Sequence, residues 1–416
     1  MESPASLTRD FSYFCGMAGV YIHIPFCKSK CGYCGFYSLP SLKLKDRFLE
    51  ALKDEMVLRK DYLRPSETVD TIYFGGGTPS LLSTEEIKDL LQLLRDTYSI
   101  HPQAEITLEA NPDTLSLKYL QSLLTIGINR LSIGIQSFFD NDLQYLGRRH
   151  DAHHAQHCLD WAKLAGFENI SIDLIYGLPT SNAEQWNRNL DVFFACHLPH
   201  LSAYALTLEP NSILTKQIEL GKALPINDDD ALRDYEILCR RTQENGYLHY
   251  EISNFCRRGM HSKHNASYWF GTPYLGLGPS AHSFDGTSRQ WNVASVEQYT
   301  AASRHCEEEP RSNPEDTMSR LPRFARNDAK RVQEKETLSP EQQYDEYVML
   351  RLRTHWGIDL KWLKREMGER FSNYCEQQAQ PLIAQGRLSQ TREFLYLTNE
   401  QMLFADGVAE ELFWES

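Results

Sequence analysis

The sequence predicts an α/β protein built around a parallel sheet and followed by a small C-terminal domain. Two observations carry this prediction. Short apolar runs alternate with amphipathic stretches from Gly19 onward, and the alternation stops near residue 245. Repeats of this kind form parallel sheets with right-handed crossovers. The repeat fits both an open, doubly wound sheet and a partial barrel, and by itself it does not choose between them.

Each of six apolar runs is followed by a stretch with helical periodicity. The strands are expected at residues 20–24, 71–74, 105–109, 130–135, 171–175 and 201–206. The helices are expected at residues 42–60, 84–98, 115–126, 141–165, 183–196 and 228–245. Ser83 or Thr84 stands where the N-cap of one helix belongs, and Ser181 or Asn182 stands where that of another belongs. Together these elements make residues 19–245 one β/α domain. Residues 1–18 show no periodicity, and we expect a disordered extension there.

The chain after residue 245 divides into three further segments. Residues 246–303 are irregular and rich in glycine and aromatic residues, which indicates a segment that covers the open side of a barrel. Residues 304–336 carry many charges, three prolines and few apolar side chains. Such a composition favours an inserted, disordered linker, with a charged surface helix as the alternative.

Residues 337–416 regain a compact pattern. Helices and one hairpin strand are expected at residues 340–353, 360–371, 376–385 and 394–397. Three helices followed by a small hairpin are typical of a winged-helix-like domain. The acidic balance of the chain argues against DNA as the partner of such a domain.

Composition and charge disfavour several classes of protein. The 416 residues are 41% apolar and 24% charged, as in ordinary globular proteins. A formal net charge of −13 disfavours nucleic acid and anionic membranes as partners. No run of ~18 apolar residues is present, so we expect no membrane span. Seven of the ten cysteines are scattered without pattern, which indicates reduced thiols and a cytoplasmic protein.

Three cysteines directly after the first strand are the most specific chemical signal. Cys27, Cys31 and Cys34 follow a C-x3-C-x2-C spacing on a loop that contains two glycines. Thiolates at this spacing suit an iron–sulfur cluster or zinc. A structural zinc site closes with four protein ligands, so zinc would need Cys15 or His23 as well. A disulfide with one spare thiol is the other alternative. Three ligands on a four-iron cluster would leave one iron open.

Polar residues follow the other expected strands, at the ends where a parallel barrel places its active site. The second strand leads into Gly75-Gly76-Gly77-Thr78, and its bare backbone can approach a ligand closely. The run does not match a P-loop, and a plain tight turn is the alternative. Glu109 and Asp173, at the third and fifth strands, can hold ribose hydroxyls or a cationic ligand. Strand-end capping or an internal salt bridge would explain them equally.

The stretch H-N-A-S-Y-W, residues 264–269, combines a histidine with flat aromatic side chains. A neutral imidazole can bind heme iron, and Tyr268 and Trp269 can pack against a macrocycle. Taken alone, a histidine beside aromatic residues is more often part of a core or a loop. By composition, other histidines are equal candidates for a ligand, namely His249, His261 and His282.

The cysteine run and its neighbours resemble the radical S-adenosylmethionine (SAM) superfamily, in the branch of oxygen-independent coproporphyrinogen oxidase and its HemW-type relatives. The resemblance implies a partial (β/α)6 barrel, a [4Fe–4S] cluster on the three cysteines, and SAM on the open iron. It also implies that the run with Gly76, Gly77 and Thr78 binds the SAM methionine. Further SAM contacts are implied at Tyr21, Tyr33, Glu109, Gln136, Arg148, Asp173 and Ala205.

Two features resemble the HemW-type heme chaperones in particular. H-N-x-x-Y-W is similar to their heme-binding motif, which implies that His264 binds heme. Phe36 stands where coproporphyrinogen oxidases have a further cysteine. The resemblance therefore implies a heme chaperone that passes heme to a respiratory heme protein. The alternatives are coproporphyrinogen III oxidation in porphyrin biosynthesis and a radical SAM enzyme that modifies RNA, which the acidic balance disfavours. Whether the chain forms a homodimer is left open.

Overall fold

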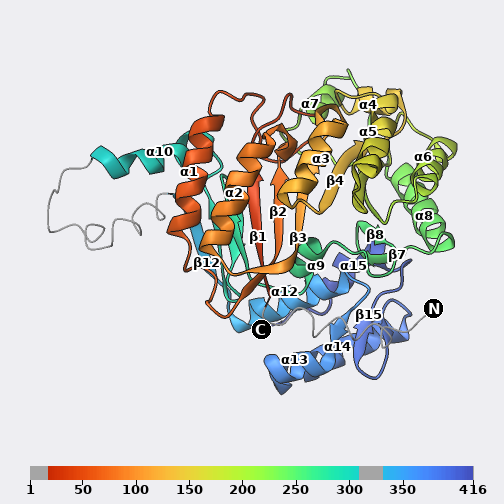
Figure 1. Ribbon diagram of the computed structural model, residues 1–416. Coiled ribbons are helices and arrows are strands. Elements are labelled where there is room, and N and C mark those ends of the chain that lie inside the picture. Colours follow the sequence, from red (N-terminus) through yellow and green to blue (C-terminus); the bar gives the residue numbers. More distant parts are fainter. Residues whose placement is uncertain (1–16, 309–330, 416) are drawn as a thin grey trace, which may run out of the picture.

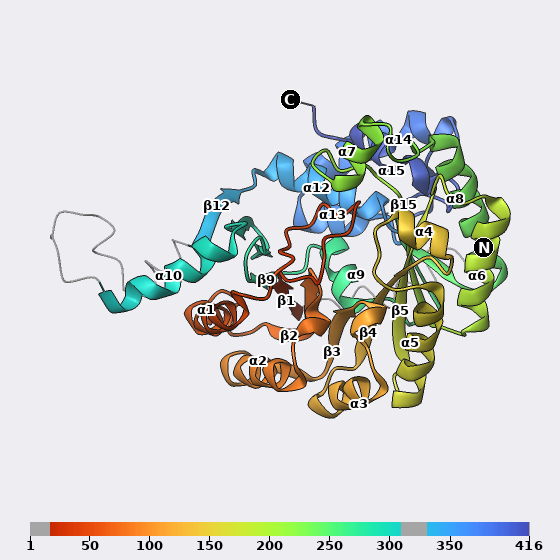
Figure 2. The ribbon, with the colours of Figure 1, turned by 90° about the horizontal axis from the view of Figure 1, so that it is seen from above.

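The computed structural model describes residues 17–308 and 331–415 (Figure 1). The expected N-terminal extension, apart from its last two residues, and most of the expected linker lie outside the described residues. A curved sheet divides the molecule. Helices cover its convex face, and the C-terminal domain lies on its concave side (Figure 2).

Six parallel strands form the centre of the sheet. They lie side by side in sequence order, namely β1 (Met17–Ile24), β2 (Thr68–Gly76), β3 (Ile100–Ala110), β4 (Arg130–Gln136), β5 (Asn169–Tyr176) and β6 (His200–Ala205). A doubly wound sheet reverses its strand order at a switch point, and no such reversal occurs among these six. The strand order therefore identifies a partial barrel, which confirms the expected fold class.

The helices between these strands pack on the convex face (Figure 2). They are α1 (Lys45–Leu58), α2 (Thr84–Thr97), α3 (Leu117–Ile126), α5 (Ala152–Ala165) and α6 (Ala183–Ala195), with α8 (Asp228–Glu244) after β6. Ser83 caps α2 in a reciprocal capping box with Glu86, and the Asn182 side chain accepts from the backbone of Gln185 at the start of α6. These side chains satisfy N–H groups that a helix start otherwise leaves unpaired.

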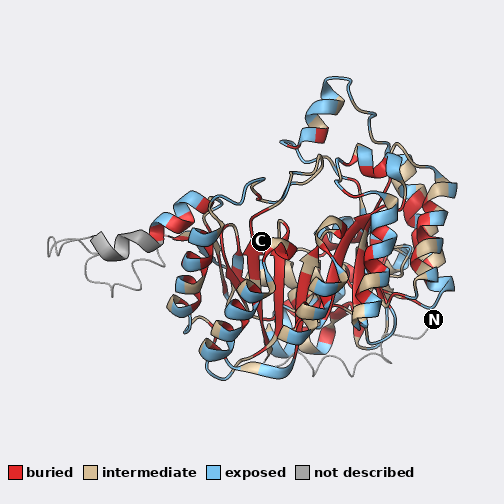
Figure 3. Ribbon diagram, turned by 45° about the horizontal axis from the view of Figure 1, so that its top comes forward, coloured by how far each residue is buried: buried red, intermediate tan, exposed pale blue. Residues whose placement is uncertain are grey.

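Successive residues of a strand point to opposite faces, and this divides β1 between two environments. Val20, Ile22 and Ile24 are fully buried in the main apolar core. Tyr21 and His23 therefore face the concave side. Figure 3 shows buried residues concentrated along the central strands. The concave face thus carries the polar and aromatic side chains that build the site.

Two helical segments differ from the expectation. The predicted helix at residues 141–165 is divided into α4 (Asp140–Tyr145) and α5, because Gly147 adopts a left-handed backbone with φ +70°. A short helix that was not predicted, α7 (Ile213–Glu219), begins at the N-cap Ser212. Its seven residues are too few for a clear helical period in the sequence.

Residues 246–303, expected as an irregular covering segment, contain five strands that extend the sheet at both edges. Antiparallel strands β7 (Leu248–Glu251) and β8 (Asn254–Cys256) lie beyond β6. Beyond β1 lie β9 (Tyr274–Leu277), β10 (His282–Phe284), β11 (Ser288–Asn292) and β12 (Val332–Thr337), with α9 (Lys263–Trp269) against β2. Both α10 (Val296–Glu308) and β12 reach into the span expected as a linker. Strand pairing with β11 orders β12 although its sequence is charged.

The C-terminal domain has its own apolar core. Its elements are α12 (Pro340–Leu352), α13 (Leu360–Glu366), α14 (Glu369–Ala384), α15 (Ala405–Glu410) and a sheet of β13 (Ile358–Asp359), β15 (Phe394–Tyr396) and β14 (Ser389–Gln390). The expected helix at residues 360–371 ends earlier, at Glu366, because Gly368 takes a positive φ of +97°. Among the described residues, no helix is both long and apolar enough to cross a bilayer.

Candidate cluster and cofactor site

The three cysteines lie on the loop between β1 and α1, at the carboxyl ends of the parallel strands. All three are half-buried free thiols. The loop is tied to its surroundings at Gly32, whose N–H donates to the Leu146 carbonyl at 3.1 Å and whose carbonyl accepts from Leu214 at 2.8 Å. These bonds hold the cysteine loop against the segment after α4 and against α7.

Two polar side chains contact the sulfur atoms. The Thr78 hydroxyl donates to Cys27 Sγ at 3.5 Å, and Arg148 Nη1 donates to Cys31 Sγ at 3.4 Å. Burial raises the pKa of Cys27 and Cys34. The Thr78 hydroxyl and the charge of Arg148 oppose the rise in the pKa of Cys27, and the thiolate is the form that binds metal. The residues present therefore fit a thiolate-bound cluster.

The alternative ligands named for zinc are placed differently. Cys15 lies outside the described residues. Both ring nitrogens of His23 are engaged, Nδ1 with the Tyr21 hydroxyl at 3.1 Å and Nε2 with the Tyr37 carbonyl at 3.0 Å. Within residues 17–308 and 331–415, no three His, Cys, Asp or Glu side chains are grouped as ligands of a single metal ion.

The glycine run turns the chain at the end of β2 and requires glycine at two positions. Gly76 has a φ of +103°, and its N–H donates to Glu109 Oε2 at 3.1 Å. A Cβ on Gly77 would lie 2.7 Å from the Phe26 carbonyl oxygen and 2.9 Å from that of Ile24. The bare backbone therefore packs against the start of the cysteine loop, where a ligand of the cluster would also lie.

Two carboxyl groups face the interior of the barrel just below this turn. Glu109 accepts from the Tyr73 hydroxyl at 2.9 Å, and Asp173 accepts from the Ser132 hydroxyl at 3.3 Å. Burial, reinforced by Asp173, raises the pKa of Glu109 to about 7, and burial raises the pKa of Asp173 to about 6. A bound cation would offset the repulsion between the two negatively charged carboxylates. The pair suits a ligand with an ammonium or sulfonium group and hydroxyls.

The remaining predicted SAM contacts lie around the same interior. Arg148 Nη2 donates to Asn111 Oδ1 and to the Gly134 carbonyl, each at 2.6 Å, which fixes the guanidinium between β3 and β4. Gln136 has a positive φ of 67° at an irregularity in the pairing of β4 with β5. Ala205 ends β6. Burial raises the pKa of Tyr33, and the Arg148 charge opposes that rise.

His264, the residue that the motif implied as a heme ligand, lies in a closed environment. It is 1% exposed, on α9 inside the barrel, with Nδ1 2.8 Å from Thr71 Oγ1 and Nε2 2.8 Å from the Tyr268 hydroxyl on its own helix. Its ring stacks on Tyr73 with centroids 4.9 Å apart. Burial lowers its pKa to about 3, so the ring is neutral. Both nitrogens are therefore engaged within the protein.

Sequence reasoning missed two groups that shape this interior. Arg130 is 1% exposed at the start of β4, and its charge opposes the raised pKa of both Glu109 and Asp173. Tyr73 holds Glu109 by a hydrogen bond. Arg130 could have been found in the sequence, because it is a charged residue at the first position of a largely apolar strand. The alternation of Thr71, Tyr73 and Gly75 on one face of β2 was an available signal for Tyr73.

Comparison with known proteins agrees with this fold. The profile of the Radical SAM superfamily matches residues 21–192, and that of the HemN C-terminal domain matches residues 338–404. The solved radical SAM enzyme coproporphyrinogen III oxidase (HemN) from Escherichia coli aligns with a TM-score of 0.77 and 23% identity. The alignment covers 99% of this chain and 94% of that one. The fold and the matching family profile thus define a protein of the radical SAM class.

The particular family follows from the sequence relatives. Heme chaperone HemW of Mycobacterium tuberculosis is 33% identical over 398 residues, 95% of this chain and 94% of the relative. Heme chaperone HemW of Bacillus subtilis is 32% identical over 396 residues, 94% of this chain and 98% of the relative. The chain belongs to the HemW family.

Proposed function

We propose that this protein is a heme chaperone that carries a [4Fe–4S] cluster, binds SAM and transfers heme to an acceptor protein. The likeness to the HemW relatives over nearly the whole chain supports this function most directly. The likeness to coproporphyrinogen III oxidase, at 23% identity, concerns the fold. Phe36, in the position where the oxidases have a further cysteine, favours the chaperone over the oxidase.

Cys27, Cys31 and Cys34 hold the cluster in this proposal. An iron–sulfur cluster with an open iron, together with SAM, supplies radical chemistry when both are bound. Thr78 and Arg148 stabilise the thiolates through their contacts with the sulfur atoms. The loop geometry supports this role, because the cysteines are tied down beside the end of β2.

The barrel interior holds SAM. The backbone of Gly76 and Gly77 lies beside the cysteine loop, while Glu109 and Asp173 supply negative charge for the cationic ligand. The other contacts follow the resemblance, namely Tyr21, Tyr33, Thr78, Gln136, Arg148 and Ala205. Arg148 joins the two binding sites, because one guanidinium contacts both Cys31 and the β3–β4 end of the barrel.

Heme is the cargo, and the H-N-x-x-Y-W motif supplies part of its site. Tyr268 and Trp269 line a cavity of about 750 Å³ between the sheet edge and the C-terminal domain. The resemblance assigns the iron to His264, which would have to exchange its bond with Tyr268 for the metal. The acceptor is a respiratory heme protein, and the transfer takes place in the cytoplasm.

Anaerobic titration of the cluster-reconstituted protein with hemin tests this function. We expect a saturable Soret change, followed by transfer of the bound heme to an apo heme protein. A parallel incubation with coproporphyrinogen III, SAM and a reductant should form no protoporphyrinogen. Steady formation of that product with SAM turnover would replace the chaperone by the oxidase, and the absence of heme binding would reject the chaperone.

A further inference from the structure

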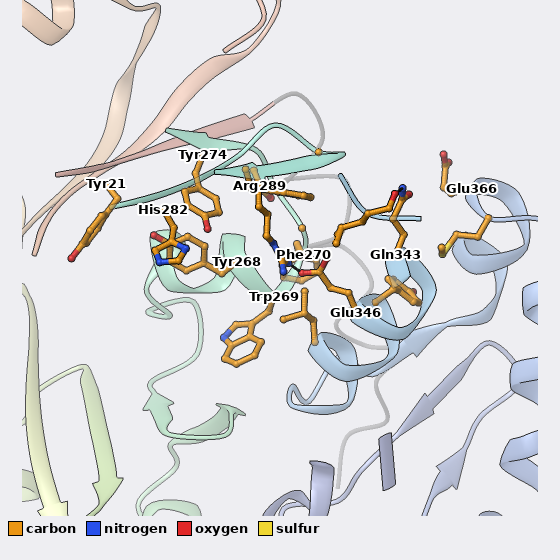
Figure 4. A pocket seen from close by; sticks show the side chains of 18 of the residues that line it. Tyr21, Tyr268, Trp269, Phe270, Tyr274, His282, Arg289, Gln343, Glu346 and Glu366 are labelled. Carbon is orange, nitrogen blue, oxygen red and sulfur yellow. Dashed lines mark hydrogen bonds and ion pairs between the residues drawn. The ribbon is translucent and has the colours of Figure 1, made fainter. Parts of the chain in front are cut away.

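A large aromatic cavity lies between the β9–β11 edge of the sheet and the C-terminal domain (Figure 4). Its volume of about 750 Å³ falls within the ~300–1,000 Å³ that is usual for small-molecule and cofactor sites. One wall comes from β10, β11 and the end of α9, and the opposite wall from α12 and α13. Phe36 and Tyr37 of the cysteine loop reach the same cavity, so it adjoins the proposed cluster.

The lining suits a flat, largely apolar ligand. Tyr268 and Trp269 contribute the end of α9, and Tyr274 contributes the sheet edge. On the C-terminal side, Tyr347 and Trp362 stack with ring centroids 4.4 Å apart and planes within 14°. Aromatic faces of this kind give broad contact area to a planar macrocycle at a small cost in side-chain entropy.

Two histidines, His23 and His282, line this cavity, and they differ in whether their ring nitrogens are hydrogen-bonded within the protein. Both nitrogens of His23 are engaged, with Tyr21 and Tyr37. His282 is exposed at the start of β10, stacks on Trp291 with centroids 5.6 Å apart, and makes no ring hydrogen bond to the described part of the chain. Figure 4 shows His282 beside Tyr268 and Tyr274 in the cavity.

The contrast with His264 is chemical as well as spatial. His264 does not line the cavity, and its Nε2 is paired with the Tyr268 hydroxyl, so the Tyr268 ring stands between His264 and the cavity. Partial burial and the charge of Arg289 lower the pKa of His282, which leaves its ring neutral at pH 7. A neutral imidazole with an unpaired nitrogen is the form that binds heme iron.

Arg289 supplies the cavity with a cation. It lies on β11, projects into the space in Figure 4, and forms an ion pair with Glu346 of α12. Glu346 and Glu366 are the acidic side chains of the lining. A carboxylate of a ligand can take the place of Glu346 on the guanidinium, since both are anions of the same geometry. The site therefore offers one anchor for a carboxylate and one for a metal.

We propose that heme binds in this cavity with its iron on His282 and a propionate on Arg289. This assignment rests on the proposed chaperone function and deepens it by placing the cargo. It differs from the assignment of iron to His264, and it makes the C-terminal domain one wall of the heme site.

Hemin titrations of four full-length variants test the iron ligand. His282→Ala should lose the histidine-ligated Soret and resonance Raman signature, and added imidazole should restore it. His264→Ala and Tyr268→Phe should keep the signature, and Tyr268→Phe tests His264 even if the buried alanine variant misfolds. His101→Ala is the matched control, because His101 is exposed and lies outside the cavity.

Three outcomes would overturn the assignment. These are an unchanged signature in His282→Ala, a loss confined to His264→Ala in protein with normal cluster content, and tighter hemin binding by Tyr268→Phe, which frees His264 Nε2. Failure of the wild type to bind hemin at all would instead reject the proposed function, so the two failures are distinguishable.

A second comparison tests the propionate contact. Arg289→Gln should weaken hemin binding by up to roughly fivefold, because the ion pair is partly exposed and such pairs are worth ~0.2–1 kcal/mol. Hemin dimethyl ester, which lacks the anionic propionates, should bind the variant and the wild type equally. An equal loss of affinity for both ligands would assign Arg289 to packing and overturn its role.

Discussion

The barrel interior and the cavity beside the C-terminal domain are lined by different kinds of side chain, although Tyr21 borders both. The interior holds the half-buried Glu109 and Asp173 together with the buried Arg130, and hydrogen bonds hold the two carboxyl groups in place. The cavity is open and aromatic, and its charged pair of Arg289 and Glu346 is partly exposed.

This difference teaches what each ligand needs from the protein. A small cation gains most from charges that are already buried and positioned, since water no longer screens them. A large macrocycle gains most from apolar area, at ~25 cal/mol per Å² removed from water. The H-N-x-x-Y-W motif spans both regions, because His264 belongs to the interior while Tyr268 and Trp269 reach the cavity.

The largest effect is expected at the cysteine loop. Cys31→Ala should abolish the broad iron–sulfur absorbance and most bound iron and sulfide, because two thiolates cannot hold the cluster that three are proposed to hold. Iron and sulfide analysis after anaerobic reconstitution measures this. Cys196→Ala, a half-buried scattered cysteine, is the control and should keep full cluster content. Equal cluster content in both variants would remove Cys31 from the site.

The next effect separates the interior from the cavity. Asp173→Asn should weaken SAM binding by roughly ten- to 150-fold, since hydrogen bonds to charged groups are worth ~1.5–3 kcal/mol. Heme affinity and cluster content should not change. Isothermal titration calorimetry measures the SAM affinity. The control is Asp191→Asn, because Asp191 is exposed. A heme affinity that falls together with SAM affinity would show that the two regions are not independent.

A substitution in the cavity should have the converse effect, on heme binding and not on SAM binding. Phe36→Ala should weaken heme binding by roughly two- to tenfold, because an aromatic contact contributes ~0.5–1.5 kcal/mol, and it should leave SAM binding unchanged. Phe36 is 70% exposed, so its loss should not lower the melting temperature. Phe404→Ala is a matched control, because Phe404 is 64% exposed and does not line the cavity. Equal hemin affinity in the two variants would contradict the cavity assignment.

The smallest effect is a pH dependence of stability that comes from the interior alone. The pKa of Glu109 is raised to about 7 from its usual 4.5, so the folded state binds a proton that the unfolded state has released. Stability from this group is present below about pH 4.5 and is lost as pH rises through about 7. In SAM-free protein, Glu109→Gln should therefore flatten the fall in melting temperature across this range relative to wild type. His282→Ala, a cavity variant, should keep the wild-type slope, and an equal flattening there would contradict the assignment.

The outcome at individual elements shows where sequence patterns suffice. The six β/α units were predictable because apolar periodicity and N-caps such as Ser83 and Asn182 act over a few residues. The division at Gly147 and the short helix α7 were missed, because one positive φ or seven residues leave a weak local signal. Strand β12 was taken for a linker because its charged sequence is ordered by pairing with β11.

The sequence by itself determined the β/α repeat, the spacing of the three cysteines, the glycine turn and the resemblance that these motifs carry, because each is written in neighbouring residues. Only the tertiary structure decided the order of the strands, the meeting of Glu109 with Asp173, and the different surroundings of His264 and His282. These depend on which distant segments pack together, and that packing decides which polar groups are paired, buried or free.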